Sequence, residues 1–382
     1  MKKITTLAVY VLIVMAAILT SCKKEPLSGH PRPGKPADTS HNNPGPNPVP
    51  PAQATYMVKV KAVINIGTIT YDSLPAELEI TSWDSAGAEH RKHITLVAGA
   101  NEVRLPKAHV RYRFRMSKWG ISDAAAFTKD NMAEGSLIEL GGSRAARKLT
   151  LEERFLFAAG NWQADAKTVY SYNGNGDVSK VDYYQKRPQH SDLKLYYTDR
   201  FVYSGSRVDK IRRFDHTGLE VGFTEFIYDE TGKIVNMHQK SYDQETYAGV
   251  EYGVDAQHSL ITIDYLYGNG HALEYKMKFR GGNKVEDNAM SSTGAGEGGT
   301  YGYDFNINPF AHMNMPNIYL SNLSKNNLVQ QQKGYSGSIP SGEPYQFEYS
   351  YDGQGYPTEL VKRYKAYVTG EELYKTKTIY TY

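Results

Sequence analysis

The sequence predicts an all-β protein, with a small N-terminal β-sandwich followed by a curved antiparallel β-meander that forms an open or partial barrel of hairpin repeats. Three observations support this fold class. Apolar and polar residues alternate in short runs after residue 55, turns rich in Asp, Asn and Gly separate the runs, and most of the 31 tyrosines follow residue 167. Alternation with a period of two is typical of strands buried on one face.

Residues 1–21 have the pattern of an export signal. Lys2 and Lys3 precede an apolar run from Ile4 to Leu19, which is shorter than the roughly 20 residues of a membrane span. Leu-Thr-Ser-Cys follows, and Cys22 is the only cysteine in the chain. This ending resembles the lipobox of bacterial lipoproteins. The resemblance implies cleavage before Cys22 and lipidation of that residue, so that acyl chains such as palmitate attach the protein to a membrane.

Residues 22–54 are predicted to be a tether. They are rich in Pro, Gly and Asn and nearly free of apolar side chains, so they cannot bury enough surface to fold. About 30 extended residues reach on the order of 90 Å.

Removal of residues 1–21 lowers the formal charge from +3 to +1, and the charges are well mixed, so we expect no nucleic-acid partner. We expect the protein to be anchored in the outer membrane. It then faces either the periplasm or the cell surface, and the sequence does not distinguish the two.

Residues 55–150 are predicted to form the β-sandwich. The run 109–116 (HVRYRFRM) shows the pattern best, because its apolar residues share one face and three arginines share the other. The stretch 122–127 (SDAAAF) is expected to be one short helix that begins at Ser122. Residues 151–166 interrupt the alternation, and we expect a connector there, with a helical turn as one alternative.

Residues 167–382 are predicted to form the meander, because turns of the type Tyr-Asp-x-x-Gly recur between alternating strands. Asp or Asn at the first turn position accepts bonds from backbone amides two residues on, and Gly supplies the positive φ. The pairs expected to make these turns are Asn173 and Gly176, Asp215 and Gly218, Asp229 and Gly232, and Asp352 and Gly355. Eight to ten strands of this kind must curl or close.

These turns are similar to YD repeats. Together with the lipobox, Asn308-Pro309-Phe310 and the stretch from Leu323 to Asn327, they resemble a family of Bacteroidota lipoproteins of unknown function. The resemblance implies a curved C-terminal antiparallel sheet over about residues 167–382. It brings no catalytic residues.

No cofactor or metal site is expected. Asn173-x-Asn175-x-Asp177 faintly resembles a calcium loop, but the position of the required Glu is Tyr184, so a hairpin turn is favoured. His90 and His93 are three residues apart in a predicted strand and face opposite sides, so they cannot chelate one ion.

The preferred function is a lipid-anchored, non-catalytic binding or scaffold module for a glycan or an envelope protein. The residues expected to contact a ligand are Tyr265, Tyr275, Tyr349, Phe310, Met313, Met315 and Tyr319. For 308–320 the favoured alternative is a plug that caps the sheet. A second hypothesis is an envelope hydrolase with a carboxylate pair in the concave face. A membrane-spanning barrel is less favoured, because tyrosines occur all along the apolar faces.

Overall fold

We describe the protein from a computed structural model, which covers residues 54–72, 75–97, 99–186, 192–294, 296–316, 324–335, 345–365 and 372–382. The chain divides into two compact units, Met1–Ala52 and Gln53–Tyr382. Cys22 and Tyr319 lie outside the described residues. Within these ranges no helix is long and apolar enough to cross a bilayer. The all-β prediction is confirmed, since strands dominate the described chain.

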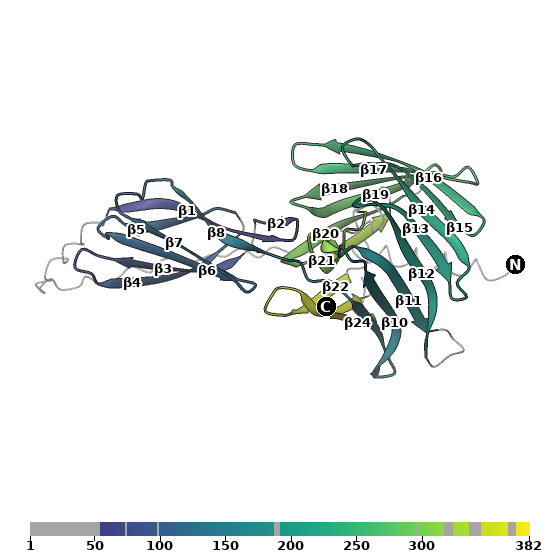
Figure 1. Ribbon diagram of the computed structural model, residues 1–382, viewed down its shortest axis with the longest axis horizontal. Coiled ribbons are helices and arrows are strands. Elements are labelled where there is room, and N and C mark those ends of the chain that lie inside the picture. The colour runs from purple at the N-terminus through teal and green to yellow at the C-terminus, as the bar shows by residue number, and fades with distance from the viewer. Residues whose placement is uncertain are drawn as a thin grey trace, which may run out of the picture. The chain divides into compact units, whose positions relative to one another are not determined.

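The first eight strands form two four-stranded sheets over a common core (Figure 1). In one sheet β1 pairs with β2, β5 and β8, and the other has the order β4-β3-β6-β7. Alternate residues of β1, including Val58, Val60 and Ile64, are fully buried in this core. The bounds are β1 Thr55–Ile66, β2 Ile69–Tyr71, β3 Ala76–Trp83, β4 Glu89–Leu96, β5 Asn101–Pro106, β6 Arg111–Lys118, β7 Ile121–Thr128 and β8 Leu137–Arg144.

The helix expected at 122–127 is wrong. These residues belong to strand β7, which pairs with β6 along its length. The three consecutive alanines favour a helix locally, but pairing with the arginine-rich strand β6 outweighs that preference. Asp123 also accepts a hydrogen bond from the backbone of Gly141 (2.9 Å), which links β7 to β8.

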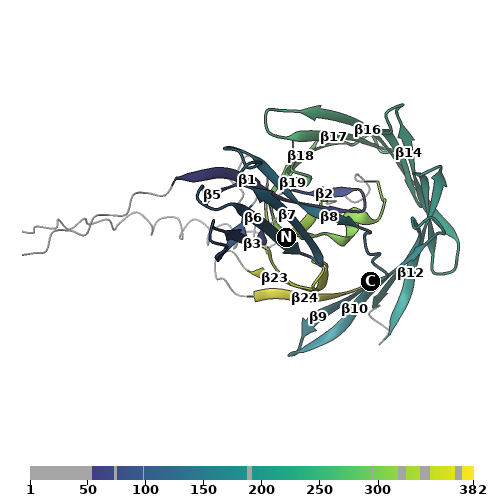
Figure 2. The same ribbon diagram turned by 60° about the vertical axis from the view of Figure 1, so that its left-hand side comes forward.

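The remaining sixteen strands close into one antiparallel barrel (Figure 2). They run in chain order, and β24 pairs with β9 to complete the ring. The bounds are β9 Leu151–Ala158, β10 Asn161–Tyr172, β11 Val178–Lys186, β12 Leu193–Ser204, β13 Arg207–Asp215, β14 Glu220–Tyr228, β15 Ile234–Ser241, β16 Gln244–Val254, β17 Ser259–Tyr267, β18 Ala272–Arg280, β19 Asn283–Ser291, β20 Gly296–Ile307, β21 Asn326–Tyr335, β22 Tyr345–Tyr351, β23 Pro357–Lys365 and β24 Glu372–Thr381.

Two sequence expectations are corrected by this ring. The barrel, expected to be open or partial with eight to ten strands, is closed and has sixteen, and residues 151–166 are no connector but strand β9 and the start of β10. The hairpin between them turns at Ala159 and Gly160, which both have positive φ (50° and 79°). Because β9 pairs with β10 on one side and β24 on the other, the barrel closes through a segment that looked irregular in the sequence.

The inside of the barrel wall carries an apolar core together with a few buried charged groups, and many charged side chains lie on the outside. In β17 and β18 the inward residues Ile263 and Met277 are buried in the core that the barrel encloses. On the outer face Lys278 pairs with Glu286 at 2.8 Å.

The two ends of the barrel differ in their connections. The sandwich end carries the turns after β10, β12, β14, β16, β18 and β22, and also the 3₁₀ helix η1 (Pro309–His312). The far end carries the hairpin turns after β9, β13, β15, β17 and β19. The predicted turns at 173, 229 and 352 therefore lie at the sandwich end, whereas the turn at 215 lies at the far end.

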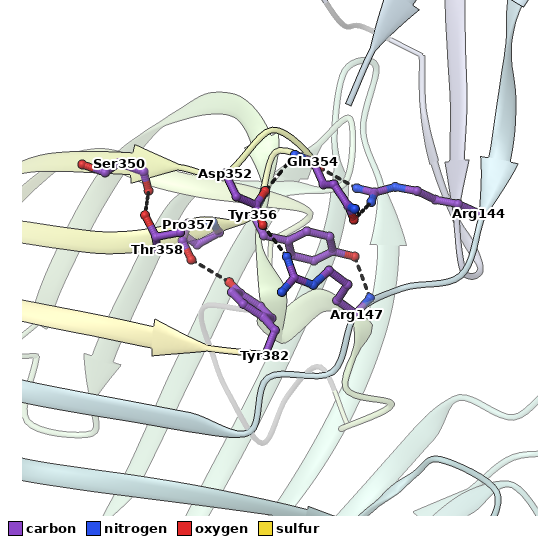
Figure 3. Close-up of polar contacts among 9 residues, drawn as sticks. All are labelled: Arg144, Arg147, Ser350, Asp352, Gln354, Tyr356, Pro357, Thr358 and Tyr382. Atoms are coloured by element: carbon purple, nitrogen blue, oxygen red, sulfur yellow. Dashed lines mark hydrogen bonds and ion pairs between the residues drawn. The ribbon is translucent and has the colours of Figure 1, made fainter. Parts of the chain in front are cut away.

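The sandwich meets the barrel at the turn between β22 and β23 (Figure 3). Tyr356 is fully buried in the sandwich core, and its hydroxyl accepts a hydrogen bond from the backbone of Arg147 (2.9 Å). The guanidinium groups of Arg144 and Arg147 lie 5.2 and 5.6 Å from the centre of its ring. Arg147 also pairs with Asp352. These contacts join the two folded parts at this turn, and a second set joins them where the Tyr71 hydroxyl of β2 meets His312 (3.0 Å) and donates to the backbone carbonyl of Lys325 (3.1 Å).

Candidate ligand groove

The Tyr-Asp-x-x-Gly turns are built by their own side chains. In the turn at 229, the Asp229 carboxylate accepts the backbone N–H of Lys233 (2.9 Å) and the hydroxyl of Thr231 (2.8 Å). Gly232 has φ 87°, a conformation that glycine adopts without strain. Asn173, Asp215 and Asp352 make the equivalent contacts, and Gly176, Gly218 and Gly355 have φ of 90°, 87° and 82°.

The tyrosine that leads each turn is also used by the fold. Tyr172, Tyr203 and Tyr228 each follow a β-bulge. Their hydroxyl groups donate to the backbone carbonyls of Leu149, Val178 and Val208, at 2.7, 2.8 and 2.6 Å. The bonds of Tyr203 and Tyr228 join each hairpin to the one before it, and the bond of Tyr172 joins the first such hairpin to the segment before β9.

The tyrosines expected to contact a ligand face the barrel interior. The Tyr275 hydroxyl donates to Asp287 (2.6 Å), and burial raises the pKa of both Tyr265 and Tyr349. Tyr349 stacks on Tyr351 at 5.8 Å. These three side chains line the inside of the wall and do not form a row on its outer surface.

The segment around η1 fills the barrel at the sandwich end. Met313 is 3% exposed within the barrel core, and Phe310 and Met315 pack against the same core. Asn308 caps η1, since its side chain accepts the backbone N–H of Phe310 (3.1 Å). The position of Met313 agrees with a plug better than with an exposed contact surface. Met315 is the member of this group that also borders a cavity.

The buried carboxylates of the barrel are each held by donors. Asp199, fully buried, accepts two bonds of 2.8 Å from Arg213. Asp287 accepts bonds from Tyr275, Tyr301 and Lys284 (2.6, 2.7 and 2.6 Å), and Asp304 accepts the backbone amides of Asn306 and Asn327 (both 3.0 Å). The described chain holds no group of three or more His, Cys, Asp or Glu suited to a metal.

A cavity of about 430 Å³ lies at the sandwich end, between the turns that follow β12 and β14. We call it the turn groove. Its lining residues are Ser206, Arg207, Val208, Tyr228, Gly232, Lys233, Ile234, Tyr252, Asn314, Met315 and Pro316. A volume of this size is typical of sites for small organic ligands.

Two cations on aromatic rings border the turn groove. The Arg207 guanidinium lies 5.5 Å from the centre of the Tyr228 ring, and the Lys233 ammonium lies 5.2 Å from that of Tyr252. A Cβ at Gly232 would come within 2.6 Å of the Arg207 guanidinium, so a larger residue here would displace that flexible side chain. Among the described residues, neither cation has a carboxylate within 4.0 Å.

The plug completes the turn groove. Asn314 has φ 50°, and its side-chain amide donates to Asp177 (2.8 Å) and to the backbone carbonyl of Ser206 (3.3 Å). These bonds anchor the segment that places Met315 and Pro316 on the groove wall. They also give Asp177, a member of the faint calcium-loop pattern, a structural partner.

Sequence reasoning missed Arg207, Lys233, Tyr252 and Asn314. A usable signal was present, because Arg207 begins the strand that follows one glycine turn, and Lys233 directly precedes the strand that follows another. The sequence pattern could not show that the turns after β12 and β14 lie side by side around one cavity.

Comparison with known proteins gives no family. No family model and no curated protein matches the chain. Among solved structures it is similar to a porin-like protein from Bacteroides uniformis (12% identity, TM-score 0.42), over 61% of this chain and 96% of that one. A porin-like protein from Bacteroides vulgatus is similar over 62% and 99% of the two chains (13% identity, TM-score 0.39). Likeness at this level does not establish a shared function.

Proposed function

We propose that the protein is a lipid-tethered component of the outer membrane envelope whose barrel is a non-catalytic binding module. The turn groove is its binding site, and the ligand is an acidic glycan. The observation that carries the proposal is the pair Arg207 and Lys233, two cations without a described carboxylate partner at the edge of one preformed cavity.

The chemistry of the turn groove supports an acidic sugar. Hydrogen bonds between charged groups are stronger than those between neutral groups, and Arg and Lys are suited to carboxylate and phosphate oxygens. Met315 and Pro316 supply an apolar wall for the C–H groups of a sugar ring. The walls are hydrogen-bonded before any ligand arrives, so little conformational entropy is lost on binding.

The tether is tested through Cys22. In cells that process lipoproteins, we expect the natural chain to partition into detergent with the membrane fraction and to incorporate labelled palmitate. Cys22→Ser should abolish the label and release the protein from the membrane, because the acyl chains supply the attachment. A membrane-bound, palmitate-labelled Cys22→Ser variant would contradict the lipid anchor.

The groove is tested by calorimetric titration of the unlipidated mature chain (residues 22–382, Cys22→Ser). We expect a hyaluronan tetrasaccharide, which is acidic, to bind more tightly than chitotetraose, which is neutral. The double variant Arg207→Gln/Lys233→Gln should weaken binding of the acidic sugar at least about tenfold, since each lost charged hydrogen bond is worth roughly 1.5–3 kcal/mol.

The matched control is Lys276→Gln/Lys278→Gln, which removes two cations from the outer wall of the same barrel. It should leave the affinity within about twofold of the natural chain, because these lysines lie away from the groove. Equal losses in the two double variants, or equal affinity for the acidic and the neutral sugar, would contradict the groove as an acidic-glycan site.

A further inference from the structure

Large exposed apolar side chains gather at the far end of the barrel. We call this set the far rim, and it consists of Phe157, Leu219, Tyr242, Leu266, Met290 and Leu373, which are 40, 66, 68, 53, 42 and 56% exposed. Single exposed apolar residues are ordinary on protein surfaces. Here they recur at one hairpin end after another.

The far rim lies at one level around the ring. Leu219 and Tyr242 are in the turns after β13 and β15. Leu266 and Met290 are one residue from the ends of β17 and β19, and Leu373 is one residue from the start of β24. In an antiparallel barrel these positions all fall at the same end, and Figure 2 shows the strands spread around a ring. A flat surface can therefore meet all six together.

The residues around Phe157 are of the types that proteins place at a membrane–water interface. The rings of Phe157 and Trp162 are 5.1 Å apart, edge to face. The Lys375 ammonium lies 5.3 Å from the centres of both rings, and that of Lys377 lies 5.1 Å from Trp162. Trp and Tyr are enriched at the headgroup level of bilayers, where lysines also extend their charge toward water.

The charged outer wall next to the far rim limits how deeply the barrel can enter a bilayer. Lys278 and Glu286 form an ion pair of 2.8 Å on its outer face, as do Lys210 and Glu225 at 2.7 Å. Moving such charges into hydrocarbon is costly. The rim can enter the headgroup layer, but the wall cannot follow it into the bilayer.

We propose that the far rim docks on a lipid bilayer surface at headgroup level. A lipid surface is the occupant that fits six apolar side chains spread over one end of the ring and bordered by Trp162 and lysines. The tether of residues 22–54, with a reach on the order of 90 Å when extended, would hold the barrel near the membrane that carries the lipid on Cys22. Only the identity of that membrane rests on the proposed lipid anchor; the docking is independent of the turn groove.

The test is co-sedimentation of the unlipidated mature chain (Cys22→Ser) with vesicles of phosphatidylcholine, with and without phosphatidylglycerol. We expect binding to both, with little dependence on salt. The rim variant Leu219→Ser/Tyr242→Ser/Leu266→Ser should lower the partition coefficient by about tenfold or more, because three apolar groups no longer enter the interface.

The matched control is Val202→Ser/Ile227→Ser/Val254→Ser, which changes three exposed apolar residues toward the sandwich end. It should bind vesicles as the natural chain does, and circular dichroism should show both variants folded. The proposal is overturned if the natural chain does not bind, if the two variants lose binding equally, or if only anionic vesicles bind and salt abolishes the binding. Self-association that the rim variant alone abolishes, without vesicle binding, would assign the rim to a second copy of the chain.

Discussion

Replacement of Asp287 by Ala is expected to destabilise the barrel by about 3–5 kcal/mol, the usual cost of leaving one partner of a buried ion pair alone. Lys284 is 1% exposed, and its ammonium lies 2.6 Å from the Asp287 carboxylate. Burial already lowers the pKa of Lys284, while the contact with Asp287 raises it. Without the carboxylate, Tyr275 and Tyr301 also lose their acceptor. Urea denaturation followed by circular dichroism measures the change.

The neighbouring residue supplies the control for Asp287. Glu286 points outward and pairs with Lys278, with both side chains nearly half exposed (46% and 40%). Glu286→Ala should cost less than about 1 kcal/mol, because exposed ion pairs contribute little. The double variant Asp287→Ala/Lys284→Met should be less destabilised than the sum of its single changes. Similar losses from Asp287→Ala and Glu286→Ala would show that the buried pair has no special role.

Two buried groups should give opposite pH dependences of stability between pH 4.5 and 6.5. Burial lowers the pKa of His312 from 6.5 to about 4, with Arg144 adding to the effect. In this range the unfolded chain binds the extra proton, so the His312 contribution falls as the pH falls. Burial raises the pKa of Glu152 from 4.5 to about 7. There the folded chain binds the proton, so its contribution rises as the pH falls. Each amounts to as much as about 3 kcal/mol.

Substitutions separate the two groups. Glu152→Gln keeps a side chain able to accept the Tyr170 hydroxyl, and it removes the gain in unfolding free energy that the natural chain draws from Glu152 as the pH falls from 6.5 to 4.5. His312→Gln removes the ring beside the Tyr71 hydroxyl (3.0 Å) and should have the opposite effect on the slope. Unfolding free energies at pH 4.5, 5.5 and 6.5 provide the comparison. If the unfolding free energy changed with pH in the same way in both variants, the opposite effects of Glu152 and His312 would be refuted.

Local pattern predicted much of the fold. Period-two alternation found most strands, and Asp, Asn and Gly found the turns, because these features depend on residues only a few positions apart. The errors fell where local preference and pairing disagreed. Alanines at 124–126 favoured a helix, although these residues pair with β6 as a strand. The mixed composition of 151–166 gave no alternating pattern, although β9 there pairs with β10 on one side and with the distant β24 on the other.

The candidate site was predicted less well than the fold. Tyr265, Tyr275 and Tyr349 have the composition of a binding surface, but closure of the ring turns them inward. Arg207 and Lys233 look like ordinary strand starts, and they border one cavity only because the turns beside them come together against the plug. Residue type shows what a side chain can bind, whereas the tertiary structure decides whether it is reachable.

The sequence by itself determined the all-β class and the residues that make each turn, whereas the export signal, the lipobox cysteine and the tether stay predictions. Each of these depends on chemistry within a few neighbouring residues. Only the tertiary structure decided four other features, which are the closure of sixteen strands, the face that each tyrosine takes, the turn groove and the far rim. They depend on which strands pair and in which register, and a shift of one residue would reverse every side chain in a strand.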